Sequence, residues 1–194
     1  MTQTNILNKT ISITAALATV LWPFLVWIGI ELGVLYYVLP VLILVFILRL
    51  SASARQKSPL RRVTLGVAMI AVILFASSMF FEEFGLLLYY PVLVSAVLLA
   101  YFFLSLFAGQ SAVEMIARLQ DPDLDSHGVA YTRGVTKLWC WFFLANGAFA
   151  LYTCLSGSMA LWVVYNGVVS YILIGLLVGA EYVYRRRILR KIYG

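Results

Sequence analysis

Three polar side chains in the last two apolar stretches of the chain have the spacing of a shared site. Asn146 and Asn166 lie at similar distances along the chain from Gly157, on opposite arms of a predicted helical hairpin, and Ser170 lies one helical turn beyond Asn166. We therefore expect the two amides at similar depth. An amide in hydrocarbon needs a partner, and interhelical hydrogen bonds stabilise membrane proteins by about 0.6–2 kcal/mol. The pattern predicts either hydrogen bonding between helices or a polar site at the midplane of a membrane.

A second candidate site consists of three carboxylates at alternate positions. Asp121, Asp123 and Asp125 resemble the start of a calcium loop, in which alternate side chains bind the ion. The match fails at the sixth position, where Ser126 replaces glycine, and at the twelfth, where Thr132 replaces glutamate. No calcium site is therefore predicted.

These acids belong to the polar segment 110–137, whose residues 111–119 have the pattern of a short amphipathic helix with an ion pair between Glu114 and Arg118. The only histidine follows the acids and has no second histidine with which to complete a metal site, so we expect a solvated loop residue rather than a base or a ligand. We interpret the segment as a cytoplasmic docking surface, with candidate residues Asp121, Asp123, Asp125, His127 and Arg133.

The sequence contains no recognisable catalytic set. A Ser-His-Asp arrangement, a phosphate loop and a CxxC motif are all missing. Cys140 and Cys154 are 14 residues apart on one predicted helix, roughly 21 Å, too far to form a disulfide with each other. Glu181 lies at the end of the last apolar run beside arginines that would pair with it, not at the midplane. We predict no catalytic residues, no metal and no cofactor.

Composition indicates that lipid surrounds most of this chain. Of its 194 residues, 63% are hydrophobic and 11% are charged, whereas soluble domains are about half apolar and about a quarter charged. The net charge of +6 does not predict nucleic-acid binding, because the basic residues bound the apolar runs, where they would face anionic headgroups.

The apolar runs predict an all-α integral membrane protein with a single domain, 1–194. The charged residues of the short breaks at Glu31 and at Glu82–Glu83 are all acidic, whereas the basic residues fall in the alternate breaks. The positive-inside rule therefore places both termini in the cytoplasm. No cleavable signal peptide is predicted. Six transmembrane helices, arranged as three hairpins, are expected over 11–30, 34–50, 63–81, 86–108, 138–155 and 159–180.

Two prolines and a pair of glycines lie inside these runs. Pro40 and Pro91 are expected to kink their helices, since proline lacks a backbone donor and crowds the preceding turn. Gly175 and Gly179 have the small-x-x-x-small spacing of helix dimers and predict a contact between two copies. Similar sequences follow Glu31 and Glu83, which suggests duplication of a hairpin; the alternative is that turns favour glycine and interfaces favour tyrosine.

Several segments together resemble an uncharacterised family of small inner-membrane proteins of Gram-negative bacteria. They are YPVLV at 90–94, AVEMIARL at 112–119, DPDL at 121–124, YTRGVTKLWCWFFLANG at 131–147 and YNG at 165–167. Genes of that family are often found in clusters for aryl-polyene pigments and related fatty-acid-like products. The resemblance implies partnership with acyl-carrier-dependent biosynthetic enzymes, and it carries no catalytic residues.

Three functions remain open from the sequence. The leading expectation is an accessory protein of a lipid or aryl-polyene pathway that holds soluble enzymes at the membrane or handles their product. The alternative is a small transporter or flippase, with Asn146, Asn166, Ser170 and the proline-containing helices along its path. The third is a membrane-embedded enzyme whose polar groups come together only in space.

Overall fold

The computed structural model describes residue 21 and residues 23–34, 37, 39–41, 43–44, 47, 61–81 and 84–193. The predicted runs 11–30 and 34–50 therefore lie only partly within the described residues. The acidic break at Glu82–Glu83 lies outside the described residues. Part of the sequence on which the proposed hairpin duplication depends therefore also lies outside them.

Every regular element among the described residues is helical. Residues 23–31 form a helix, and residues 39–41 are helical. The remaining elements, in chain order, are α3 (Arg61–Phe81), the 3₁₀ helix η1 (Phe84–Tyr89), α4 (Tyr90–Ser105), α5 (Ala112–Ala117), α6 (Ser126–Leu155), α7 (Met159–Val164), the π-helical turn η2 (Tyr165–Val169) and α8 (Ser170–Tyr193).

Three helical stretches of this described part are long and apolar enough to cross a membrane, namely Gly85–Ser105, Ser126–Leu155 and Met159–Arg187. A shorter apolar helix covers Val63–Ser78. The predicted all-helical class is thus confirmed for the described residues, and three stretches have the length and composition to cross a membrane. The count of six spans and their sidedness remain predictions.

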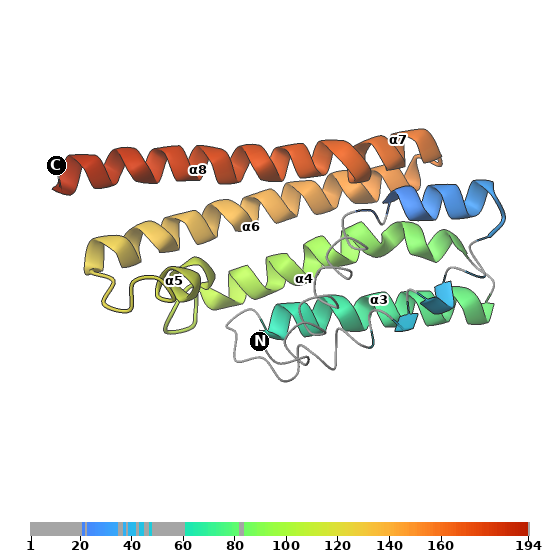
Figure 1. The fold of residues 1–194 in the computed structure, drawn as a ribbon, viewed down its shortest axis with the longest axis horizontal. Helices are drawn as coiled ribbons and strands as arrows, with labels where there is room; N and C mark the ends of the chain where they lie inside the picture. Colours follow the sequence, from blue (N-terminus) through green and yellow to red (C-terminus); the bar gives the residue numbers. More distant parts are fainter. Residues whose placement is uncertain are drawn as a thin grey trace, which may run out of the picture.

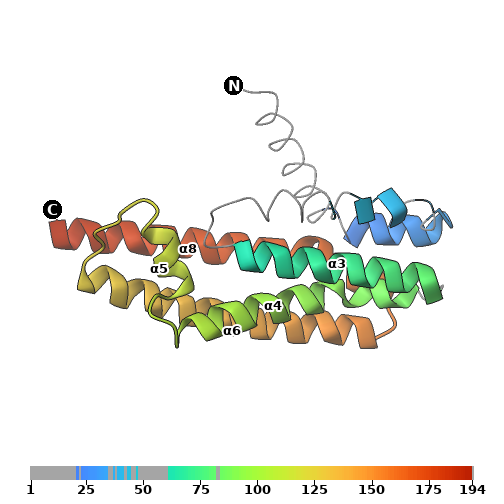
Figure 2. The same ribbon diagram turned by 90° about the horizontal axis from the view of Figure 1, so that it is seen from below.

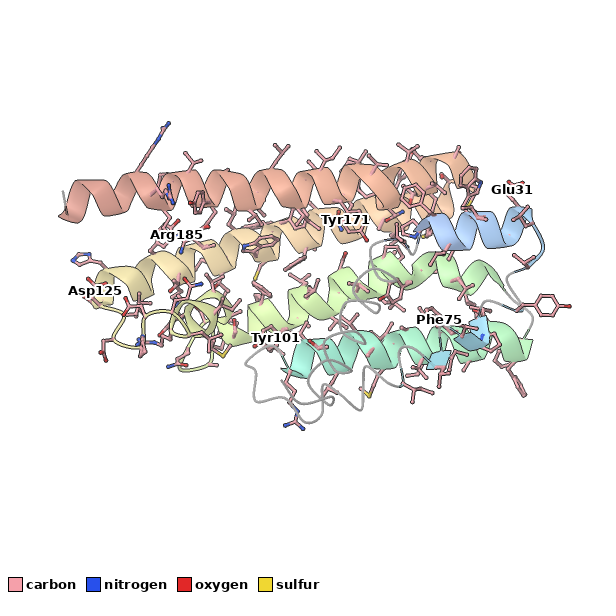
Figure 3. The ribbon with its side chains drawn as sticks, in the orientation of Figure 1. Glu31, Phe75, Tyr101, Asp125, Tyr171 and Arg185 are labelled. Carbon is pink, nitrogen blue, oxygen red and sulfur yellow. The ribbon has the colours of Figure 1, made fainter. Side chains whose placement is uncertain are left out.

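The helices run along a common axis, and the ends of this bundle differ in character (Figure 1). One end, called here the α5 end, carries α5, the first turn of α6 and the end of α8; in Figure 2, α5 lies across the bundle axis there. The opposite end, called the Gly157 end, carries the turn between α6 and α7. Figure 3 shows Asp125 and Arg185 at the α5 end and Glu31 at the Gly157 end.

Gly157 and Ser158 form the expected turn between α6 and α7. Gly157 has φ of 68°, a left-handed conformation that glycine adopts without steric cost. Ser158 then caps α7, because its hydroxyl accepts a hydrogen bond from the N–H of Leu161 at 3.3 Å. The expected hairpin between the last two apolar runs is therefore present.

Helix α6 begins earlier than its apolar run. The run was expected from residue 138, yet α6 starts at Ser126 because Asp125 caps it: the Asp125 carboxylate accepts from the N–H of Gly128 at 2.8 Å. The helix has 30 residues, about 45 Å at 1.5 Å each, whereas about 20 residues span a bilayer. Almost half of the polar segment 110–137 is therefore a helical extension of a predicted span.

Pro91 lies where η1 passes into α4, and the kink expected there remains a prediction. Pro91 is in the first turn of α4, directly after η1, a position that tolerates proline. Because Pro91 has no N–H, it cannot continue the 3₁₀ ladder onto the carbonyl of Leu88. That carbonyl accepts instead from the indole N–H of Trp162 at 3.0 Å and from the thiol of Cys154 at 3.1 Å. Pro40 is exposed and lies in a helical stretch, and its predicted kink remains a prediction.

Two apolar clusters hold the bundle together. The first lies toward the Gly157 end around Phe75, Leu87 and Trp162, and the second lies toward the α5 end around Phe102 and Phe143. Between them, α4 and α6 approach closely at Gly147, where an added Cβ would lie 3.1 Å from the Cβ of Ser95. Small residues at such a crossing allow two helices to pack without lipid between them.

Candidate functional site

The described residues enclose a cavity of about 900 Å³ at the α5 end of the bundle. Side chains from α3, α4, α5, α6 and α8 line it. This volume is at the upper end of the roughly 300–1,000 Å³ typical of small-molecule sites. Its inner wall is apolar and consists mainly of Leu98, Phe102, Val135, Trp139, Phe143 and Val178.

Part of this wall is a cluster of aromatic rings. The ring of Phe102 on α4 lies 5.2 Å from that of Phe143 and 6.3 Å from that of Trp139, and the rings of Trp139 and Phe143 are 5.4 Å apart. Trp139 and Phe143 are one turn apart on α6, so they present their rings on one face. These residues were not expected from the sequence. The i, i+4 spacing of Trp139 and Phe143 was the available signal, but only the tertiary structure places Phe102 opposite them.

The mouth of the cavity is polar and contains four of the five predicted docking residues. Asp121, Asp123, Asp125 and His127 all line the cavity and are exposed to solvent. Arg133 does not line it: its guanidinium donates to the carbonyl of Leu106 at 2.6 Å, just after the end of α4. The structure therefore separates Arg133 from the other four residues. Their docking role remains a prediction.

Two further polar groups at the mouth come from α8. The hydroxyl of Tyr131 on α6 donates to the Glu181 carboxylate at 3.2 Å, and Arg185 lies 3.5 Å from the same carboxylate oxygen. The expected pairing of Glu181 with a neighbouring arginine is thus present. The hydrogen bond between Tyr131 and Glu181 links α6 to α8 at the edge of the cavity.

Helix α5 forms one side of the mouth and is tied firmly in place. Glu114 is only 5% exposed; its carboxylate accepts from Arg118 Nε at 2.9 Å and from the N–H of Ser111 at 3.4 Å. Arg118 also donates to the carbonyl of Pro122 at 2.9 Å, which fixes the acidic loop. The predicted Glu114–Arg118 pair is therefore confirmed, and it positions the mouth of the cavity.

Asn146 makes hydrogen bonds that connect three elements. Its amide donates to the hydroxyl of Ser95 on α4 at 3.1 Å, and its carbonyl accepts from the hydroxyl of Tyr165 in η2 at 3.2 Å. Asn166, the residue after Tyr165, bonds elsewhere: its amide donates to Thr153 Oγ1 at 3.1 Å and to the carbonyl of Trp162 at 2.9 Å. The two asparagines thus connect helices through different partners and not through each other.

The π-helical turn explains why Asn166 points back along its own helix. Widening a helix at η2 disturbs the regular backbone ladder, and the side chain of Asn166 supplies a donor to the carbonyl of Trp162. Asn166 is 4% exposed, and no donor among the described residues reaches its Oδ1 atom. Ser170, one turn further on, is also buried. A polar midplane site at these residues remains a prediction.

The glycines of the predicted dimer motif lie on an open face. Gly175 and Gly179 are exposed, and an added Cβ at either position would meet no described atom within 4 Å. This face of α8 therefore has room for lipid or for a second copy, and the contact between two copies remains a prediction.

The described site combines an apolar wall with a charged mouth. No group of three His, Cys, Asp or Glu side chains within the described ranges is arranged to hold a metal ion. The arrangement offers an apolar, aromatic compartment with a charged mouth, which suits a molecule with an apolar chain and a polar head. No known protein family, curated protein or solved structure matches this chain.

Proposed function

We propose that the chain is a multi-pass protein of the bacterial inner membrane, with six spans as three hairpins and both termini in the cytoplasm. Three described helices of spanning length support the membrane location. The charges support the sidedness, since Arg118, Arg133 and Arg185 belong to the α5 end and Glu31 lies at the opposite end (Figure 3). By the positive-inside rule the α5 end, and with it the mouth of the cavity, faces the cytoplasm.

Within this membrane the protein holds the apolar chain of an amphiphilic molecule, and the cavity of about 900 Å³ is the observation that carries this proposal. An aliphatic or polyene chain would lie against Leu98, Phe102 and Phe143, where burial of apolar area is favourable by about 25 cal/mol per Å². Its polar head would remain at the mouth, beside His127 and Arg185, where water has access.

The proposed pathway is the synthesis of a lipid or of an aryl-polyene-type product, with this protein as an accessory that handles the product. The family resemblance and the amphiphilic form of the cavity support this assignment. Acyl-carrier-dependent enzymes work in the cytoplasm, and the acidic loop with Asp121, Asp123 and Asp125 is the surface they would meet.

The test is photo-crosslinking of the purified protein in lipid vesicles with a photoreactive long-chain fatty acid. We expect labelling of peptides that line the cavity, and we expect an unlabelled polyene fatty acid to compete with it. Val178→Trp should weaken competition about tenfold, because overpacking costs about 1–3 kcal/mol and 1.4 kcal/mol is a factor of ten. Val178 is 49% exposed, so the larger side chain can enter the cavity without disrupting a core.

The matched control is Ile172→Trp on the same helix, at a position that is 56% exposed and does not line the cavity. It should leave competition unchanged. Labelling that cannot be competed, or that both variants alter equally, would show that the fatty acid only coats the lipid-facing surface, and the proposed function would be wrong.

A transporter is the second candidate, and the unsatisfied Oδ1 atom of Asn166 within a π-helical turn is the observation that favours it. Such turns occur often at functional sites, and a buried acceptor can receive a hydrogen bond from a passing polar group. The cavity at the α5 end, however, is not lined by Asn146, Asn166 or Ser170.

A further inference from the structure

A second cavity, of about 540 Å³, lies between α6 and α8 on the other side of Tyr131. It is called here the lateral groove. Three residues, Tyr131, Val135 and Glu181, line both it and the larger cavity, so they form the partition between the two. The remaining lining of the lateral groove is Ala130, Gly134 and Leu138 on α6 and Leu177, Ala180 and Tyr184 on α8.

The partition depends on few interactions. One hydrogen bond crosses it, from the Tyr131 hydroxyl to Glu181 at 3.2 Å, and the rings of Tyr131 and Tyr184 stack at 6.3 Å. Within the described part of the chain, α6 packs closely against α4 and α5, and near the Gly157 end against α7 and η2. The close packing of α8 is with η2, the turn from which it starts. The α5 end of α8 therefore lies beside α6 without a packed seam.

The start of α8 provides a place where the helix can pivot. In η2 the N–H of Ser170 bonds to the carbonyl of Tyr165, five residues back, in place of the regular spacing of four. Interruptions of this kind are common sites of helix bending. The displacement caused by a small rotation there grows along the 24 residues of α8, so Glu181 would move further than the residues next to η2.

With the predicted spans 138–155 and 159–180, the lateral groove lies at the cytoplasmic boundary of the membrane, and its residues Leu138 and Leu177 reach into the spans. Leu138, Ala180 and Tyr184 are exposed. The ionisable side chains that line the groove are those of Tyr131, Glu181 and Tyr184. An exposed apolar groove that continues into a larger cavity through a thin partition has the form of a lateral entrance, since an acyl chain in the bilayer already lies parallel to such helices.

We propose that the amphiphile reaches the large cavity from the bilayer, sideways between α6 and α8, past Tyr131 and Glu181. This inference rests on the proposed function and names the source of the ligand. The chain slides through the lateral groove while the head follows along the membrane surface toward the mouth of the large cavity. The ligand is thus a single-chain amphiphile dissolved in the lipid.

The test measures how fast a polyene fatty acid, supplied in the bilayer of donor vesicles, quenches tryptophan fluorescence of the protein in acceptor vesicles. Trp139 lines the large cavity, so the part of the quenching that disappears in Trp139→Phe reports arrival there. Gly134→Phe and Ala180→Phe each fill the lateral groove alone, and we expect several-fold slower quenching with the same final extent. The control is Ile172→Phe, at an exposed position of α8 that lines neither cavity.

Tyr131→Phe should act in the opposite direction, because it removes the hydroxyl that donates to Glu181, and quenching should become faster. Saturable quenching whose rate is the same in wild type, Gly134→Phe and Ala180→Phe would overturn the lateral route alone and would favour access from the cytoplasm. Absence of any saturable quenching at Trp139 would remove the proposed function and the route together.

Discussion

The carbonyl of Leu88 permits a sharp test of how the helices are held together at the Gly157 end. Trp162 is 1% exposed, and its indole N–H is one of two donors that replace the missing N–H of Pro91. We expect Trp162→Phe to destabilise the protein, because it removes this hydrogen bond and part of the buried ring. We expect the same change to be less damaging in a Pro91→Ala background, where residue 91 can donate to the carbonyl itself.

The size of this coupling follows from the hydrogen bond alone. A buried hydrogen bond contributes a net of about 0.5–1.5 kcal/mol, and in membranes the measured average is near 0.6 kcal/mol. The loss of ring area is common to both backgrounds and cancels in a double-mutant cycle. Since the Cys154 thiol still donates to the carbonyl at 3.1 Å, we expect a coupling of about 0.5–1 kcal/mol.

The assay is unfolding in mixed micelles with increasing denaturing detergent, followed by circular dichroism, for wild type, both single variants and the double variant. Adding Cys154→Ala to Trp162→Phe should cost more than the sum of the two changes, because the carbonyl then keeps neither donor. Strict additivity in both cycles would show that Pro91 does not direct these two side chains, and the account of this end of the bundle would be wrong.

Two further predictions concern the α5 end and the middle of the bundle. Glu114→Ala should destabilise the local fold of α5 by about 1–3 kcal/mol, because Arg118 and the N–H of Ser111 lose their acceptor. Faster proteolysis between residues 106 and 125 would show this loss of local stability, and an unchanged cleavage rate would contradict it. Changing both Asn146 and Asn166 to leucine removes four hydrogen bonds and should lower stability by about 2 kcal/mol, at about 0.6 kcal/mol each, in the same unfolding assay. Full stability combined with loss of transport would instead support the transporter.

The all-helical class, the apolar helices of spanning length and the hairpin at Gly157 could be predicted from the sequence because they depend on local properties. Continuous apolar runs of spanning length have few solutions other than helices, since each backbone group must be satisfied within its own segment. The turn at Gly157 and the Glu114–Arg118 pair were predictable for the same reason: partners lie within a few residues of each other. The start of α6 at Ser126 was missed, although Asp125 is a good helix cap, because the polar residues that follow suggested a loop.

The sequence by itself determined which residues are apolar enough to enter lipid and which short-range partners meet, because chain spacing alone controls both. Only the tertiary structure decided that Phe102 faces Phe143, that Tyr131 reaches Glu181 across 50 positions of the chain, and that Arg133 turns away from the acidic loop. The cavity and the lateral groove depend on how helices distant in the chain pack and diverge. Such packing reflects the shapes of many side chains at once, and no local pattern encodes it.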